Sequence, residues 1–188
     1  MPKPPPVKRL PACLTSRELP RRMGLHLHLM PIRRITQIPH PASRQSPVPW
    51  GQSWPTPDGL VIRVVGVDLD AWPRVLAENQ FNDPPAEGMR MVMVSVEVTN
   101  QDGDAETPRK IDDSDYRVVG DRGVIYSSFD SITRCGVIPD ELDWELFPAA
   151  TVTGNVCVML PQDEGELRLI YKPGSDWGEE VVYFDLAE

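Results

Sequence analysis

The segment between residues 89 and 100 constrains the fold of this chain most strongly, because it contains the longest alternating apolar run in the sequence. The valines of this run are Val92, Val94, Val96 and Val98. They share one face of an extended strand, while the other face carries mixed, increasingly polar residues. Pro84, Pro85 and Gly88 exclude a helix just before it, and turn-forming residues follow at 100–104. A period of two with β-branched residues predicts a strand, and we place it at the centre of a β-sandwich.

Strand-like runs recur along the rest of the chain, and turn-forming residues separate them. The predicted strands cover residues 60–69, 89–100, 116–120, 124–129, 151–160, 166–172 and 181–186. We predict a β-bulge at Gly66, where the alternation shifts. Residues 71–80 are compatible with a short helical turn, but Pro73 and the polar residues that follow it favour a loop. Seven short strands without a convincing helix predict an all-β fold, an immunoglobulin-like antiparallel β-sandwich.

The first quarter of the chain differs from the rest in composition. Residues 1–45 carry nine cationic side chains and one acidic side chain, which gives a net charge of +8. Because the whole chain has a net charge of −9, residues 46–188 carry −17. The first segment is also rich in proline and has no sustained apolar period. Such a segment buries too little surface to offset its chain entropy. We predict a disordered basic tail at 1–45 and one domain at 46–188.

The tail contains no segment that we identify as an export signal or a transmembrane span. A signal peptide needs an uninterrupted apolar stretch after its basic residues. The apolar stretch at residues 25–30 is too short and is interrupted by two histidines. The segment Leu10-Pro11-Ala12-Cys13 faintly resembles a lipoprotein processing site, but no apolar stretch precedes it. The tail is either a genuine basic arm or the result of a wrongly assigned start, and we favour the second interpretation.

Cys135 and Cys157 are the two cysteines that follow the tail. Their separation suits a disulfide between an irregular loop and the strand at 151–160, and closing such a loop contributes roughly 3 kcal/mol in the chain-entropy model. The alternation of that strand places Cys157 opposite its aliphatic face, so the bridge would lie on the outer or rim side of the sandwich. A bridge implies an oxidising compartment. The alternative is two unpaired, small hydrophobic residues in a cytosolic protein.

Residue types that many enzymes require are missing from the domain at 46–188. All three histidines of the sequence, His26, His28 and His40, lie in the tail. The domain therefore lacks a histidine general base, a Ser-His pair and a histidine metal site. Its acidic charge argues against nucleic acid as a partner, because a phosphate-binding face needs clustered Lys and Arg. We predict no catalytic residue, no cofactor and no bound metal.

Acidic side chains gather in two predicted loops. They are Asp112, Asp113 and Asp115 in the first loop, and Asp140, Glu141, Asp143 and Glu145 in the second. Carboxylate oxygens suit a hard cation such as calcium, but neither loop has the ligand spacing of a dedicated calcium loop, so we favour solvated loops. A hydrolase-like carboxylate pair is a related alternative. We interpret the five tryptophans as plugs at the ends of the sandwich rather than as a ligand-binding patch.

Four segments of the sequence resemble one protein family. They are Asn79-x-Phe81-Asn82-x-Pro84-Pro85-x-x-Gly88, the valine-rich strand ending in Val98-Thr99-Asn100, Cys135-Gly136-Val137-Ile138-Pro139 and Thr153-Gly154-Asn155-Val156-Cys157. Together they are similar to a bacterial extracellular immunoglobulin-like domain of unknown function, of the DUF4352 type, over residues 46–187. The resemblance implies a β-sandwich related to small secreted immunogenic mycobacterial proteins and an exported location, as in secreted proteins and lipoproteins. It also implies a Cys135–Cys157 bridge and no catalytic residues.

These observations predict a non-catalytic domain that binds or scaffolds in the extracellular space or the cell envelope. We expect the end loops at 71–88, 101–115 and 133–148 to contact a protein or another cell-surface ligand, because the sheets fix the bases of such loops. We also expect a monomer. The alternatives are a metal-dependent, calcium-type module or a hydrolase that uses the acidic loops, and a cytosolic interaction protein if the cysteines are reduced.

Overall fold

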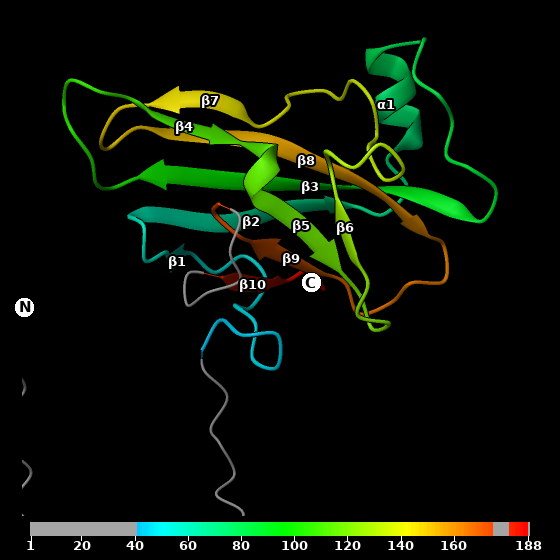
Figure 1. The fold of residues 1–188 in the computed structure, drawn as a ribbon, viewed down its shortest axis with the longest axis horizontal. Coiled ribbons are helices and arrows are strands. Elements are labelled where there is room, and N and C mark those ends of the chain that lie inside the picture. The colour runs from blue at the N-terminus through cyan, green and yellow to red at the C-terminus, as the bar shows by residue number, and fades with distance from the viewer. Residues whose placement is uncertain (1–40, 175–180, 188) are drawn as a thin grey trace, which may run out of the picture. The chain divides into compact units, whose positions relative to one another are not determined.

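The computed structural model describes residues 41–174 and 181–187, whose strands form two four-stranded sheets and one two-stranded sheet (Figure 1). The first sheet has the order β1-β2-β3-β8 and consists of β1 (Trp54–Pro55), β2 (Leu60–Asp68), β3 (Met89–Asn100) and β8 (Thr151–Pro161). The second sheet has the order β10-β9-β5-β6 and consists of β5 (Tyr116–Val119), β6 (Ile125–Ser127), β9 (Arg168–Tyr171) and β10 (Val182–Asp185). The third sheet consists of β4 (Arg109–Asp112) and β7 (Asp143–Leu146). These strands pair antiparallel, which confirms the predicted all-β sandwich.

Strand β3 lies in the middle of the first sheet, as predicted. It pairs with β2 on one edge and with β8 along almost its whole length on the other. The register between β2 and β3 shifts between Val64 and Gly66, which confirms the predicted bulge. The other six predicted strands are also present, each within a few residues of its predicted bounds.

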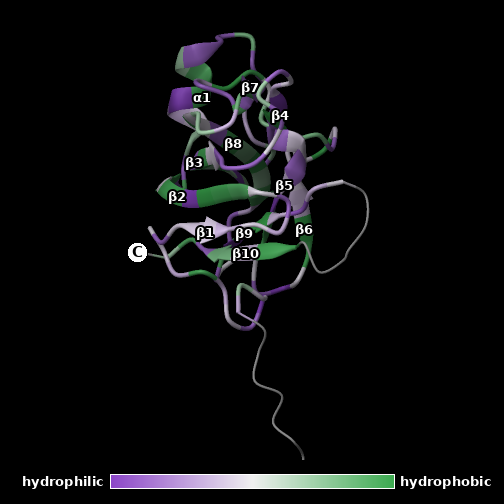
Figure 2. Cartoon of the chain, turned by 90° about the vertical axis from the view of Figure 1, so that its left-hand side faces the viewer, coloured by the Kyte–Doolittle hydropathy of each residue, from purple (hydrophilic) through white to green (hydrophobic). Residues whose placement is uncertain are grey.

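The main core lies between the two four-stranded sheets. The four alternating valines of β3 each have an exposed fraction of 0% and meet Val118, Leu169 and Phe184 from the second sheet in one cluster. Figure 2 shows the hydrophobic colour that dominates β2 and β10. The rings of Tyr116 and Tyr171 lie in this core with their centroids 5.3 Å apart and their planes tilted by 54°, a favourable arrangement for an aromatic pair. Each fully buried side chain of this size contributes about 1.5–3 kcal/mol.

A short helix, α1 (Trp72–Glu78), packs on the outer face of the first sheet, so the prediction of a loop at 71–80 is wrong. Pro73 lies in the first turn of the helix, where its missing N–H removes no helical hydrogen bond. Val75 is completely buried against Met91 and Met93. Packing of the helix on the sheet therefore outweighs the weak local signal in the sequence.

The two acidic segments predicted as loops each contain a strand. Residues 101–115 include β4 and residues 133–148 include β7, and these two strands pair with each other. Each places one buried apolar side chain in the main core, Ile111 from β4 and Leu146 from β7. A strand of four residues with a single buried side chain shows too little alternation to be recognised from the sequence.

The domain begins before the predicted boundary at residue 46. Ala42 and Val48 are buried in the main core. The main-chain N–H of Val48 donates to the carbonyl of Tyr183 at 2.7 Å, and the N–H of Asp185 donates to the carbonyl of Val48 at 2.8 Å. This segment thus adds to the edge of β10 and covers its unpaired groups. Residues 1–40, for which we predicted disorder, lie outside the described residues.

We predict that Val48→Ala lowers the free energy of unfolding by about 2 kcal/mol, because it removes buried methyl groups from the core. The matched control is Val65→Ala, since Val65 is 39% exposed in β2. That change should alter stability by less than about 0.5 kcal/mol. Urea unfolding of both variants measures the difference, and equal stabilities would show that the segment at 42–48 does not belong to the core.

Candidate functional site

The predicted disulfide between Cys135 and Cys157 is present, with the two Cα atoms 5.8 Å apart. Cys157 points away from the main core, as the alternation of its strand predicted. It does not lie at an open rim, however, because both cysteines are buried in a second apolar cluster beneath α1. Met91 and Met93 from β3 and Val75 from α1 surround the bridge. The bridge therefore ties the chain after β6 to the outer face of β8.

Two further sets of contacts fix the segments around the bridge. The main-chain N–H of Met159 in β8 donates to the carbonyl of Thr133 at 2.7 Å. The side-chain amide of Asn82 donates to the carbonyls of Val75 at 2.9 Å and Val137 at 2.7 Å, and its oxygen accepts from the N–H of Val137 at 2.9 Å. One asparagine therefore connects α1, the chain after α1 and the segment that carries Cys135.

Large apolar side chains face water on this framework. Phe81 has an exposed fraction of 83% and precedes Asn82, and Val137, which Asn82 holds, has an exposed fraction of 51%. Ile132, 76% exposed, lies three residues before the bridged Cys135. We call the side chains of Phe81 and Val137, whose segments Asn82 connects, the Phe81 surface. Exposed apolar side chains on fixed backbone are a common feature of interaction sites.

The three predicted contact loops do not meet at one place. Residues 71–88 and the first part of 133–148 adjoin each other through Asn82 and Val137. Residues 101–108 follow β3 at its other end, where the N–H of Ala149 donates to the carbonyl of Asn100 at 2.7 Å (Figure 1). The sandwich therefore presents two separate loop surfaces, and only the first carries the Phe81 surface.

The acidic residues of the two predicted loops do not form a metal site in the described part of the chain, where no group of three or more His, Cys, Asp or Glu side chains is arranged to hold a metal ion. Asp112 caps the 3₁₀ turn η1 (Asp113–Asp115) by accepting from the N–H of Ser114 at 2.9 Å. Asp143 pairs with Lys110 across the small sheet. Burial and the nearby carboxylate of Asp112 raise the pKa of Asp115. These carboxylates are thus distributed among turns and ion pairs.

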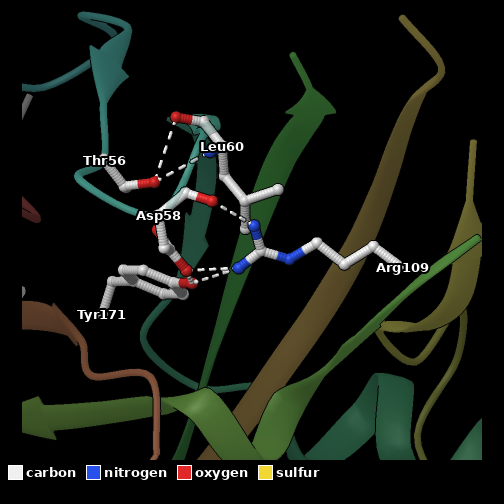
Figure 3. Close-up of polar contacts among 5 residues, drawn as sticks. All are labelled: Thr56, Asp58, Leu60, Arg109 and Tyr171. Carbon is white, nitrogen blue, oxygen red and sulfur yellow. Dashed lines mark hydrogen bonds and ion pairs between the residues drawn. The ribbon is translucent and has the colours of Figure 1, made fainter. Parts of the chain in front are cut away.

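A polar cluster that the sequence did not reveal connects all three sheets (Figure 3). Asp58 lies in the turn between β1 and β2, Arg109 in β4 and Tyr171 in β9. The hydroxyl of Tyr171 donates to Oδ2 of Asp58 at 2.6 Å, and Arg109 donates to both the carboxylate and the carbonyl of Asp58. We call these three residues the Asp58 brace. The side chain of Thr56 closes the turn by accepting from the N–H of Leu60 at 3.0 Å.

The charges of the Asp58 brace are balanced within it. Burial opposes ionisation of Asp58, but hydrogen bonding from Thr56, Tyr171 and Arg109 outweighs it and lowers the pKa of the carboxyl. Burial and the hydrogen bond to Asp58 raise the pKa of Tyr171, so its hydroxyl keeps its proton. The Asp58 carboxylate is thus engaged by Arg109 and Tyr171, and the brace connects the three sheets.

The tryptophans divide into two groups. Trp50 and Trp54 pack against the main core, and Trp72 packs against the second cluster on the outer face of the first sheet. Trp144 in β7 is 48% exposed. Trp177 lies outside the described residues.

Comparison with known proteins places the chain in a family. The model of a domain of unknown function, DUF4352, matches residues 70–182. The chain belongs to the DUF4352 family. No curated protein matches the sequence, and no helix in the described part of this DUF4352 protein is long and apolar enough to cross a membrane.

Several solved structures are similar to this DUF4352 domain. The secreted protein MPT63 from Mycobacterium tuberculosis is 10% identical, with a TM-score of 0.49 over 74% of this chain and 97% of its own. The yjhA protein from Bacillus subtilis is 14% identical, with a TM-score of 0.45 over 74% and 99%. An uncharacterized β-sandwich protein from Clostridium difficile 630 is 9% identical, with a TM-score of 0.44 over 76% and 95%.

We predict that Asp58→Asn lowers the free energy of unfolding at pH 7 by about 2 kcal/mol, because it removes hydrogen bonds to a charged acceptor. The pKa of Asp58 is lower in the folded than in the unfolded protein, so its stabilisation is complete above the unfolded value of about 3.9 and is lost as the pH falls through the folded value. The difference between wild type and variant should therefore shrink below about pH 4.

Urea unfolding across this pH range checks the prediction. Glu97→Gln is the control, because Glu97 pairs with Arg63 on the surface and should contribute less than about 1 kcal/mol. A difference between wild type and Asp58→Asn that does not change with pH would contradict the role of the charge.

Proposed function

We propose that this chain is a non-catalytic binding domain of the extracellular space or cell envelope, and that the Phe81 surface contacts a protein partner there. The observation that carries the proposal is the exposure of Phe81 and Val137 on backbone fixed by Asn82 and by the nearby disulfide. Large apolar side chains held in this way gain more by burial against a partner than by remaining in water.

The rigidity of the surface supports a role in binding. Asn82 fixes the position of Val137, and the bridge fixes the segment on the sheet, so few side chains need to be ordered when a partner binds. A partner with an apolar contact surface would bury Phe81, and aromatic side chains commonly dominate the energy of such contacts.

The disulfide supports a location outside the cytosol. Both cysteines are buried, and β8 and the segment before β7 meet at the bridge. Disulfides of this structural kind persist in oxidising compartments. The non-catalytic part of the proposal is supported by the sequence, whose three histidines all precede residue 41, and by the dispersal of the acidic side chains over turns and ion pairs.

We predict that the protein isolated from its native host without reductant carries Cys135 and Cys157 as a bridge. The measurement is the intact mass before and after treatment with a thiol-alkylating reagent in denaturant, which exposes both cysteines. We expect neither cysteine to be alkylated unless a reductant is added first. Alkylation of both cysteines without reductant would overturn the extracellular proposal and favour a cytosolic interaction protein.

We also predict that a photo-crosslinking residue at position 81 captures one specific protein in the native host, because Phe81 lies at the proposed contact. The matched control is the same residue at position 147, since Phe147 is 50% exposed and lies after β7 near the opposite end of β3. Val137→Ser should reduce the yield of the adduct at position 81. Absence of an adduct at 81, or the same adduct at 147, would contradict the proposed surface.

A further inference from the structure

The sequence contains two Asp-Gly pairs, Asp58–Gly59 and Asp102–Gly103. Such pairs undergo a spontaneous reaction in which the main-chain nitrogen of glycine attacks the carboxyl carbon of the preceding aspartate. Glycine favours this reaction because it has no Cβ and lets the backbone reach the conformation required for attack. The reaction proceeds only where both groups can move, so the structure around each pair decides whether it occurs in the folded protein.

Hydrogen bonds hold both groups of the Asp58–Gly59 pair that would have to react. The carboxylate of Asp58 accepts from Tyr171 and Arg109 in the Asp58 brace. The N–H of Gly59, which would have to attack, donates to the carbonyl of Thr56 at 3.1 Å. The carbonyl of Gly59 accepts from the N–H of Gln101 at 3.0 Å. Reaction at this pair requires the turn between β1 and β2 to open first.

The Asp102–Gly103 pair lacks such hydrogen bonds, and the side chain of Asp102 only lies against Gly59. Residues 101–107, which leave β3, are all exposed. Within the described part of the chain, neither the carboxylate of Asp102 nor the N–H of Gly103 has a hydrogen-bond partner. Gly103 already has a φ of 124°, a value that residues with a side chain rarely adopt. Opening of such a segment costs little free energy.

We propose that Asp102–Gly103 is a site of spontaneous isomerisation in the folded protein, while Asp58–Gly59 is protected by the Asp58 brace. A bond forms between the nitrogen of Gly103 and Cγ of Asp102, and the hydroxyl of the carboxyl group leaves with the amide proton as water. Water then opens the resulting succinimide. Attack at the Cα carbonyl carbon leaves the chain running through Cγ as isoaspartate, and attack at Cγ restores aspartate, so the net mass is unchanged.

The core tolerates this change because β3 is fixed just before it. The N–H of Asn100 donates to the carbonyl of Ala150 at 3.0 Å, and its side-chain amide donates to the carbonyl of Leu146 at 3.0 Å. The isoaspartate adds one methylene to the exposed backbone that follows Asn100, and it places a free α-carboxylate at position 102. The altered surface lies at the end of β3 opposite the Phe81 surface, so the inference does not depend on the proposed function.

The test is incubation of the folded full-length chain at neutral pH and 37 °C, followed by trypsin digestion and electron-transfer fragmentation, which distinguishes isoaspartate from aspartate. Cleavage at Arg44, Arg63, Arg90 and Arg109 places the two pairs in different peptides. We expect isoaspartate in peptide 91–109 to exceed that in peptide 45–63 by more than about tenfold, after subtraction of a sample taken at time zero. In denaturant, where the brace is broken, the two pairs should react at similar rates.

Two variants complete the experiment. Asp102→Glu keeps the charge but lengthens the side chain, so it should abolish the signal in peptide 91–109 without changing the fold. Tyr171→Phe removes one hydrogen bond to the Asp58 carboxylate but keeps the Asp58–Gly59 pair, so it should raise isoaspartate at residue 58 in the folded protein. Equal modification of the two peptides in the folded protein, or modification of neither there while both react in denaturant, would overturn the proposal.

Discussion

The first half of β3 is buried on both faces, and much of the structure follows from this constraint. Met91, Val92, Met93 and Val94 have exposed fractions of 0–1%. A two-layer sandwich covers only the inner face of each sheet, so the two methionines need a second cover on the outside. The helix α1 and the bridged segment before β7 provide it. Beyond residue 94 the outer face carries Ser95, Glu97 and Thr99, and these polar side chains need no apolar cover.

The sequence predicted those parts of the fold whose information is local. The runs that became β2, β3 and β8 are nine to twelve residues long and rich in apolar and β-branched residues, so each is recognisable as a strand from the sequence. The helix α1 was missed because Pro73 suggested a break, although proline at a first turn is compatible with a helix. The consecutive apolar residues 91–94 are the signal that points to a cover on both faces, because a strand with one solvated face would alternate strictly.

The contacts that sequence reasoning did not find connect residues that are distant along the chain. Arg109 and Tyr171 meet Asp58 across separations of 51 and 113 residues. Nothing in the local pattern around any of the three distinguishes them from ordinary turn or strand residues. The bridge, also between distant residues, was predicted as one of two alternatives because cysteines are few and can be considered as a pair. Charged and polar partners are too numerous for the same approach.

The cover over Met91 and Met93 also explains where exposed apolar side chains arise. The chain leaves the sheets twice to form this cover, once between β2 and β3 and once between β6 and β7. A loop that only crossed the surface would be polar and variable in conformation. Here Asn82 and the bridge fix both excursions on β8 and α1, so Phe81 and Val137 keep their positions although water surrounds them. The conformational entropy of this surface is lost during folding, which would lower the cost of binding the partner that we propose.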